Sequence, residues 1–207
     1  MKLYLSSYHI GNEAEKLKEM VGVNKNAAII RNALDFSTDI ERLKNGLEVE
    51  INDLKSIGFE PENLNLKDYF GKKDDLRNKL KDLGLVWVTG GNTFILRRAM
   101  QESGFDEIIK EYVGKDSLVY AGYSAGVCVI TPTLKGLELV DDPNIIPDGY
   151  KSEIIWDGIG LINYSVASHY KSNHPESSAV DKEVDYFIEN KMPFIALRDG
   201  EAIIENV

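Results

Sequence analysis

The chain has 207 residues, of which 43% are hydrophobic and 28% are charged, and its formal net charge at pH 7 is -10. These proportions are typical of a folded globular protein and argue against a disordered chain. The acidic balance would repel phosphate backbones and anionic lipid surfaces, so we expect neither nucleic acid nor a membrane as a partner. Small molecules and short peptides remain as candidate ligands.

Cys128 is the only cysteine, which excludes an intrachain disulfide and a cysteine metal cluster. The N-terminal segment lacks the apolar run of a signal peptide, and no segment has the roughly 20 apolar residues that span a bilayer. We therefore expect a cytoplasmic protein with one domain over residues 1–207. The chemistry considered below requires no cofactor and no metal.

The first half of the sequence alternates between strand and helix patterns. Short apolar runs at 2–6 and 26–33 predict strands, and the segment between them has apolar residues at helical spacing. A long helix is predicted over 39–58, ended by Gly58, and a short strand over 63–66. A charged helix is expected to follow in "KKDDLRNKLKDLG".

The second half begins with two strands that are apolar throughout, 85–88 and 117–122, separated by the helical patterns "NTFILRRAMQES" and "FDEIIKEYV". A loop-rich passage follows residue 132, and then a helix in "VDKEVDYFIENK" and strands in "FIAL" and "EAIIE". Apolar strands that alternate with helices indicate a parallel sheet covered on both faces. We predict an α/β fold, a three-layer αβα sandwich with a mostly parallel sheet.

The segment "AGYSAG" contains the pattern G-x-S-x-G, formed by Gly122, Ser124 and Gly126. It lies between an apolar strand and a second apolar run, which is the strand-turn-helix context of a nucleophile elbow. Glycines permit a strained turn and close packing of strand and helix, while the serine projects from the carboxyl edge of the sheet. Ser124 is therefore the candidate nucleophile.

A serine hydroxyl needs a base to accept its proton, and histidine suits that role near neutral pH. The chain offers only His9, His169 and His174. His9 follows the first strand, and His174 lies in a polar loop. We favour His169, because it ends a β-like run where the loops of the active edge begin.

The base in turn needs an orienting acid. In the chain order of α/β-hydrolases the acid lies between serine and histidine, and four aspartates occupy that interval in suitable loops: Asp141, Asp142, Asp148 and Asp157. Asp199 is the alternative, after an apolar strand and before Gly200. An Asp-Gly pair is also common in plain hairpin turns, so the residues alone leave the choice of acid open.

Acyl transfer requires hydrogen-bond donors for the developing oxyanion. The N–H of Ala125 is one candidate, and the backbone at Gly91 in "VTGGNTFIL" is a second. Asn92 is expected to cap the helix that follows or to contact substrate. Tyr170, next to the candidate base, is a further candidate for substrate binding. Cys128 is expected to pack beside the elbow without a catalytic role, because serine holds the apex.

The segments "TGGNTFIL", "AGYSAG" and "SHY", in this order, resemble the peptidase E family of α-aspartyl dipeptidases and their cyanophycinase relatives. The resemblance covers essentially the whole chain. It implies an α/β sandwich related to class I glutamine amidotransferases, with Ser124 as nucleophile and His169 as base. The family's "L-x-E-G" turn reads Leu197 to Gly200 here, so Asp199 would be the acid. Asp141 and Asp142 rank second.

Aspartyl-specific members of that family carry an arginine on the helix after the histidine, and Ser178 occupies the equivalent position here. A hydroxyl cannot pair with a carboxylate as a guanidinium does. We therefore expect a peptidase for short peptides without a preference for N-terminal aspartate. Two rival interpretations are an esterase of α/β-hydrolase type and a catalytically silent binding domain. The oligomeric state is not predicted.

Overall fold

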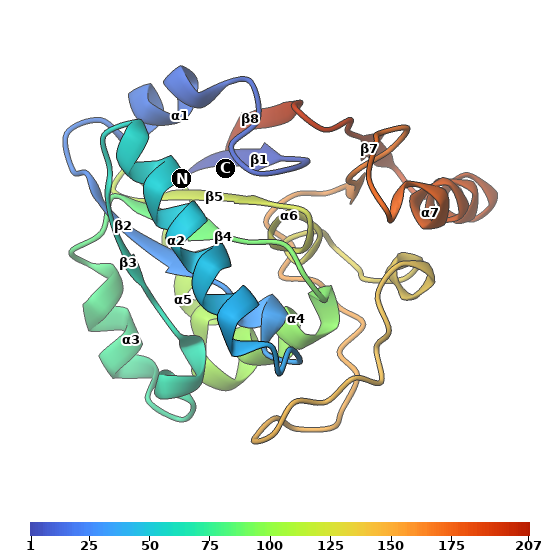
Figure 1. The fold of residues 1–207 in the computed structure, drawn as a ribbon, viewed down its shortest axis with the longest axis horizontal. Helices are drawn as coiled ribbons and strands as arrows, with labels where there is room; N and C mark the ends of the chain where they lie inside the picture. Colours follow the sequence, from blue (N-terminus) through green and yellow to red (C-terminus); the bar gives the residue numbers. More distant parts are fainter.

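The computed structural model describes residues 1–207, and its centre is a six-stranded sheet with the order β3-β2-β4-β5-β1-β8 (Figure 1). Neighbouring strands are parallel except for β1 and β8, which are antiparallel. This confirms the mostly parallel sheet. The strands are β1 (Lys2–Ser6), β2 (Asn26–Ile30), β3 (Glu60–Asn63), β4 (Leu85–Val88), β5 (Val119–Tyr123) and β8 (Ala202–Asn206).

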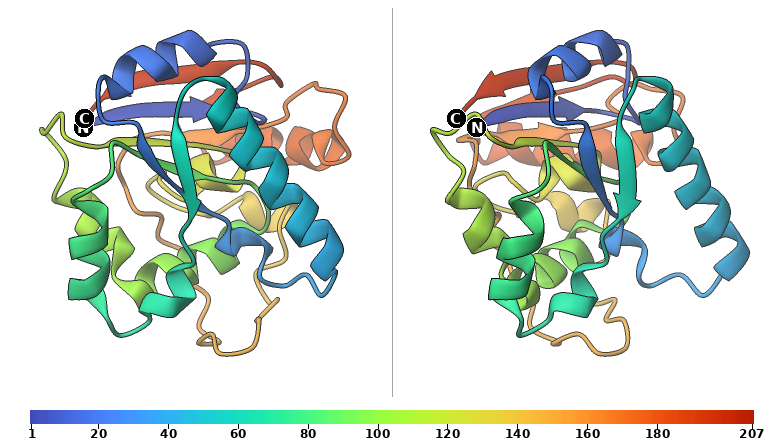
Figure 2. Two further views of the ribbon diagram at one scale, coloured as in Figure 1. Left: turned by 60° about the vertical axis from the view of Figure 1, so that its left-hand side comes forward. Right: turned by 90° about the vertical axis from the view of Figure 1, so that its left-hand side faces the viewer.

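Helices cover both faces of this sheet, as the turned views in Figure 2 show. One apolar cluster joins α1 (Ala14–Val21) and α2 (Ile40–Ser56) to one face. A larger cluster joins the other face to four helices, α3 (Lys73–Leu80), α4 (Thr93–Ser103), α5 (Phe105–Lys110) and α6 (Ala125–Cys128). The three-layer αβα sandwich expected from the sequence is confirmed. None of the helices combines the length and the apolar composition that a membrane crossing requires.

A second, two-stranded parallel sheet lies beside the main one and consists of β6 (Ser165–Ala167) and β7 (Phe194–Ala196). The helix α7 (Ser177–Glu189) packs on it through Val180, Val184 and Phe187. Figure 1 shows β7 and α7 in the orange part of the chain, and β6 contacts α6. It brings the C-terminal third of the chain to the carboxyl edge of the main sheet.

Two predicted strands differ from the structure by three residues, and the bounds of the others agree to within two. The strand predicted over 63–66 lies instead at Glu60–Asn63, where it pairs with β2. Leu64 and Leu66 are apolar because they insert into the core after the strand has ended, and the short helix η2 (Leu66–Tyr69) begins there. The strand predicted over 26–33 stops at Ile30 and gives way to the short helix η1 (Asn32–Leu34).

The strand β2 ends before Asn32, whose side chain is hydrogen-bonded to the backbone of the segment after β3. Its Oδ1 accepts a hydrogen bond from the N–H of Leu66 at 3.0 Å. Tertiary hydrogen bonds of this kind override the β preference of a short run. A third short helix, η3 (Leu137–Leu139), lies in the passage that was expected to be rich in loops.

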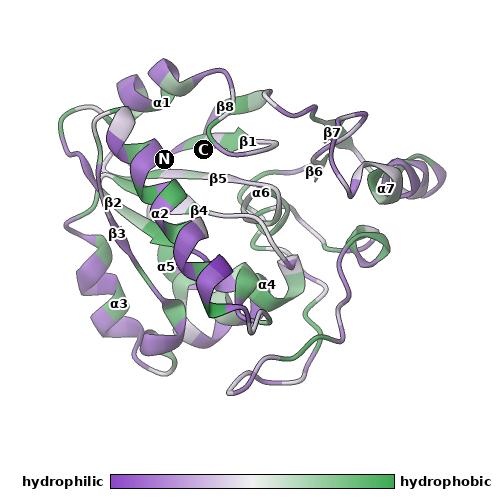
Figure 3. Cartoon of the chain, viewed as in Figure 1, coloured by the Kyte–Doolittle hydropathy of each residue, from purple (hydrophilic) through white to green (hydrophobic).

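The helix α2 is amphipathic, and its purple and green bands in Figure 3 mark polar and apolar positions. On its inner side lies Glu50, a carboxyl that is only 4% exposed. Its two oxygens accept hydrogen bonds from the Trp87 Nε1–H at 2.8 Å and the Tyr123 hydroxyl at 2.7 Å. Burial alone raises the pKa of Glu50, but these bonds and the neighbouring His9 outweigh it, so the pKa lies below its usual value. Glu50 thus ties α2 to β4 and to the end of β5.

We expect Glu50→Ala to lower the free energy of unfolding by about 2 to 5 kcal/mol, because it leaves two buried donors, on Trp87 and Tyr123, without an acceptor. Glu50→Gln retains one acceptor oxygen and should cost clearly less. Urea unfolding followed by tryptophan fluorescence measures both variants. Equal stability of Glu50→Ala and the wild type would show that the network is not stabilising.

Candidate active site

Ser124 lies between β5 and α6 with backbone angles φ 50° and ψ -117°. A non-glycine residue with positive φ is uncommon and costs of the order of 1 to 3 kcal/mol in strain. The turn is held because the carbonyl of Ser124 accepts hydrogen bonds from the N–H groups of Val127 and Cys128, at 2.8 and 2.9 Å. The hydroxyl of Tyr120 also donates to the carbonyl of Gly126 at 2.6 Å. The serine is therefore fixed at a sharp apex above the sheet.

The two glycines of the pattern are required by the close approach of β4. A Cβ on Gly122 would lie 2.5 Å from the carbonyl oxygen of Val88, and a Cβ on Gly126 would lie 2.2 Å from the same atom. Real Cβ atoms do not approach oxygen so closely, and the obstacle is rigid backbone. The structure thus contains the strand, sharp turn and helix expected of this segment.

His169 follows β6 and is 2% exposed, with φ 62°. Its Nδ1 lies 2.7 Å from Oδ1 of Asp199. Asp199 follows β7, and the strands on either side of it belong to different sheets, because β7 pairs with β6 and β8 pairs with β1. The Asp-Gly turn is therefore not a simple hairpin.

Ser7, which the sequence analysis did not single out, connects the histidine and the aspartate. Its hydroxyl donates to Asp199 Oδ1 at 2.9 Å and accepts from the N–H of His169 at 2.8 Å. The residue is fully buried directly after β1. Its position at the carboxyl end of a central strand was the available signal, because those ends meet at one edge. The N–H of Asp199 also donates to the Ser172 hydroxyl at 2.8 Å.

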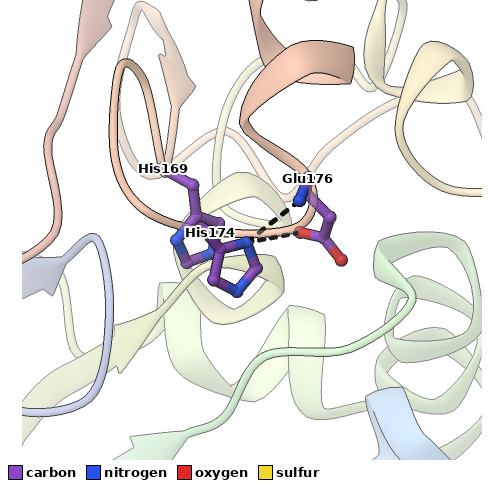
Figure 4. A group of neighbouring side chains, drawn as sticks. All are labelled: His169, His174 and Glu176. Carbon is purple, nitrogen blue, oxygen red and sulfur yellow. Dashed lines mark hydrogen bonds and ion pairs between the residues drawn. The ribbon is translucent and has the colours of Figure 1, made fainter.

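His174 stacks on His169, with ring centroids 3.7 Å apart and planes 9° apart. Figure 4 shows His174 in front of His169, with dashed lines from its ring to Glu176. Its Nδ1 accepts from the N–H of Glu176 at 3.3 Å and lies 3.9 Å from the carboxylate. The sequence analysis placed His174 in a polar loop and did not anticipate this contact.

The ligand atoms of His169, His174 and Glu176 lie within 4.8 Å of one another. A metal requires lone pairs that converge on one point at about 2.0 to 2.2 Å. Parallel stacked imidazoles direct their in-plane lone pairs side by side, and both Nδ1 atoms already have hydrogen-bond partners. The arrangement does not fit a metal centre, so we assign none to it.

The pKa of His169 lies below the usual value of 6.5. The main cause is burial, which disfavours the charged ring, and the neighbouring His174 acts in the same direction. The hydrogen bond to Asp199 opposes these effects without cancelling them. The imidazole is accordingly neutral at pH 7 and able to accept a proton.

Ser124 and His169 line one pocket, together with residues from α4, α6, α7 and the loop after η3. Its other lining residues are Thr93, Ala125, Cys128, Leu137, Val140, Asp141, Ser168, Glu176, Val180 and Glu183. The Cys128 thiol is buried beside the elbow, and burial raises its pKa well above the ordinary value. A protonated thiol is a poor nucleophile. This agrees with the expectation that Cys128 packs at the elbow.

The aspartates between serine and histidine make other contacts. Asp141 lines the pocket but accepts from the N–H of Thr93 at 2.8 Å, and the Asp142 side chain accepts from Asn144. At Asp148 and Asp157 it is the backbone carbonyl that accepts a hydrogen bond, from Lys67 and from Arg97 respectively. None of the four has a hydrogen bond to His169, so the structure brings only Asp199 to its ring.

The remaining predicted residues lie as follows. Ala125 is the first residue of α6, where helix N–H groups have no partner within the helix. Gly91 has φ 135°, and a Cβ there would lie 2.6 Å from the carbonyl of Ala33. The Asn92 side chain caps α4 by accepting from two N–H groups. Tyr170 packs with the apolar residues beneath α7 and lies outside the pocket.

His9 lines a different pocket, between α2 and the sheet, with Arg31, Glu50 and Tyr123 among its neighbours. Its Nδ1 is 3.5 Å from Glu50, which raises the pKa of His9. The ring stacks on Tyr123, the residue before Ser124, with centroids 5.1 Å apart, and Ser124 does not line this second pocket. His9 is therefore part of the support behind the elbow.

Known structures share this fold over almost the whole chain. A putative peptidase E from Listeria monocytogenes EGD-e superposes with a TM-score of 0.73 at 22% identity, covering 100% of this chain and 98% of that one. A peptidase from an acI-B1 Actinobacterium gives 0.71 at 16% identity, with 99% and 83% covered. At these identities the likeness establishes the fold.

Curated sequences give a more specific relation. An uncharacterized peptidase of Listeria innocua is 30% identical over 139 residues, which is 63% of each chain. A probable alpha-aspartyl dipeptidase of Drosophila melanogaster is 26% identical over 155 residues, 72% of this chain and 59% of that protein. The matches thus span about three fifths of the length of these relatives. The family model of peptidase family S51 matches residues 14–206, and the chain therefore belongs to peptidase family S51.

Proposed function

We propose that the protein is a serine peptidase of the peptidase E kind that hydrolyses short peptides through an acyl-enzyme. Ser124 is the nucleophile, His169 the general base and Asp199 the orienting acid. The observation that carries the proposal is the 2.7 Å contact between His169 Nδ1 and Asp199, in a pocket shared with a serine on a strained elbow. Membership of family S51 supplies the class of reaction.

With Asp199 ionised, the proton of neutral His169 resides on Nδ1, which leaves Nε2 free to accept the proton of Ser124. The serine oxygen then attacks the carbonyl carbon of the N-terminal residue. The N–H of Ala125 is the proposed oxyanion donor, with the backbone at Gly91 as the second. Protonated His169 gives its proton to the leaving amine. Water then gives a proton to His169 and attacks the ester carbonyl, and His169 returns that proton to the Ser124 oxygen as the acyl group leaves as a free acid.

Ser7 is proposed to hold the base and the acid in register. It accepts from the backbone of His169 and donates to Asp199, so one hydroxyl fixes both members. His169 itself has positive φ, a conformation that needs support from its surroundings. Neither a metal nor a cofactor takes part in any step.

We expect Ser124→Ala to reduce kcat by at least about 10⁴-fold, because the nucleophile is lost while the packing is retained. Its unfolding free energy should stay within about 0.5 kcal/mol of wild type. Ser124→Gly should be equally inactive but more stable by about 1 kcal/mol, because glycine tolerates positive φ. Peptide hydrolysis and urea unfolding test both. Activity near wild type in either variant would disprove the assignment, and absence of labelling of Ser124 by a serine-reactive phosphonate would favour a silent binding domain.

Replacement of the acid distinguishes the proposed triad from an α/β-hydrolase arrangement. Asp199→Asn should lower kcat by about 10² to 10⁴-fold, because the amide favours the wrong tautomer of His169. Asp142→Asn is the matched control, since its carboxylate contacts only Asn144, and it should retain activity within about threefold. The reverse result would place the acid between serine and histidine.

The pH profile of kcat/KM for a dipeptide with uncharged side chains, such as Leu-Leu, should rise with pH between 5 and 7, because His169 must be neutral. Its lowered pKa places the midpoint below 6.5. His174→Asn removes a neighbour that lowers this pKa and opens the ring to water, so the midpoint should move to higher pH. A midpoint that is unchanged by this substitution, or a profile that is flat from pH 5 to 8, would contradict His169 as the base.

A further inference from the structure

The pocket between α2 and the sheet, which the proposed mechanism does not use, has a volume of about 320 Å³. Arg31 and Arg42 both line it, and we call it the arginine pocket. Tyr123, directly before the elbow serine, lines it as well, so the pocket reaches the base of the elbow. Its single carboxyl, Glu50, already accepts two hydrogen bonds from neighbouring side chains. The pocket thus holds two guanidinium groups and one carboxylate that is already bonded.

Neither of these arginines has a carboxylate partner, although the chain carries 34 acidic residues and both Arg77 and Arg97 are paired. Arg31 makes one side-chain hydrogen bond, from Nη1 to the carbonyl of Leu43 at 2.7 Å. Its Nε is buried without a partner. Burial lowers the pKa of Arg31, but a guanidinium stays charged in proteins. A partly desolvated cation with unused donors favours an anion in the pocket beside it.

Gly46 leaves room for the Arg31 side chain. It lies in the interior of α2, where glycine is disfavoured relative to alanine. A Cβ at this position would lie 2.7 Å from Nη2 of Arg31, closer than real Cβ atoms approach other atoms. An alanine would therefore displace the guanidinium from its place at the pocket. The position of the guanidinium explains a glycine that the helix itself does not favour.

The strand register sets the distance between Arg31 and the elbow. Ile30 pairs with Val88, and Val88 pairs with Gly122, so the ends of β2 and β5 lie level and two strands apart. Strands are about 4.8 Å apart, which places the backbone of Arg31 about 10 Å from that of Tyr123. One peptide residue advances about 3.8 Å, and an arginine side chain covers the remainder. A group one residue beyond the scissile carbonyl is therefore within reach of Arg31.

The smaller pocket beside Ser124 indicates how a peptide is oriented. Its volume of about 20 Å³ admits one water-sized group, and it is lined by three carboxyls and no cation: Asp141, Glu176 and Glu183. The Oε1 of Glu183 is buried and has no hydrogen-bond partner. These features suit the α-ammonium that every peptide with a free N-terminus carries, which lies next to the carbonyl under attack.

The two pockets lie at opposite faces of the sheet. The smaller one is lined from α4 and α6, which pack on one face, and the arginine pocket is lined from α2, which packs on the other. With the ammonium in the smaller pocket, the residue beyond the scissile bond extends toward the arginine pocket. The negative end of a short peptide then meets the two arginines.

We propose that the arginine pocket binds the carboxylate of the leaving residue, with Arg31 as the specificity-determining residue and Arg42 as a second cation. This inference rests on the proposed peptidase function and adds a subsite to it. Phe36 and Val49, which are 45% and 47% exposed, also line the pocket and offer contact to an apolar side chain of the same residue.

The test compares kcat/KM at pH 7 for Leu-Leu and for leucyl-leucinamide, which has the same shape without the C-terminal charge. The wild-type enzyme should prefer Leu-Leu by about 10 to 100-fold, the effect of a charge-assisted pair. Arg31→Gln should reduce this ratio to below about threefold by slowing Leu-Leu and not the amide. Arg31→Lys keeps the charge without the planar fork and should give an intermediate ratio.

Lys44→Gln is the matched control, because it removes a positive charge at an exposed position of α2 outside the arginine pocket. It should leave the ratio as in wild type. Arg42→Gln changes an exposed side chain, so it remains informative if Arg31→Gln fails to fold, and it should lower the ratio at least about twofold. Leucyl-glutamide with a free side-chain carboxylate shows which carboxylate is bound: turnover like that of Leu-Leu assigns the side chain, and turnover like that of the amide assigns the α-carboxylate.

Equal kcat/KM of wild type for Leu-Leu and its amide would overturn the inference and leave the peptidase function standing. A preference for Leu-Leu that persists in folded Arg31→Gln and Arg42→Gln proteins would assign it to other groups and also overturn the inference. Calorimetric binding of both peptides to Ser124→Ala separates the two proposals. Tighter binding of Leu-Leu without hydrolysis by wild type would overturn the proposed function and keep the subsite, and binding of neither peptide would overturn both.

Discussion

The close packing of the elbow against β4 is the constraint on which the site depends. One carbonyl, that of Val88, occupies the space in which side chains at Gly122 and Gly126 would lie. Because both positions lack a Cβ, β5 and α6 approach β4 closely enough to fold Ser124 into positive φ between them. The strained conformation of Ser124 is therefore maintained by close packing at the centre of the sheet, where the surrounding structure is rigid.

The other residues of the proposed site reach the neighbourhood of Ser124 from distant parts of the chain because of the sheet order. β1 and β8 pair next to β5, which places Ser7 and the turn at Asp199 on the same edge as the elbow. His169 follows β6, and Asp199 follows β7, the strand that pairs with β6. This pairing places His169 beside Asp199 and Ser7. Ser7 is the residue through which these elements meet, since it bonds to both His169 and Asp199.

Carboxyl groups near Ser124 differ sharply in surroundings. The carboxylate of Asp199 has the His169 ring and the Ser7 hydroxyl as hydrogen-bond partners. Glu183 lies among apolar side chains, and its pKa is raised to about 8 by burial.

The sequence by itself determined the strand and helix alternation, the elbow and the candidate nucleophile, because these depend on local spacing and on the conformations that glycine allows. It also indicated His169 and Asp199, the latter only as one of several acids. Tertiary structure decided what local pattern cannot encode: the contact between His169 and Asp199, the hydroxyl of Ser7 between them and the stacking of His174. The third strand also lies at residues 60–63 and not at 63–66. Leu64 and Leu66 are apolar because they pack in the core after the strand has ended, a role that the sequence pattern does not distinguish from a strand. The unpaired carboxyl of Glu183 was also invisible in sequence, since a helical glutamate is ordinarily solvated and only packing shows that this one is buried.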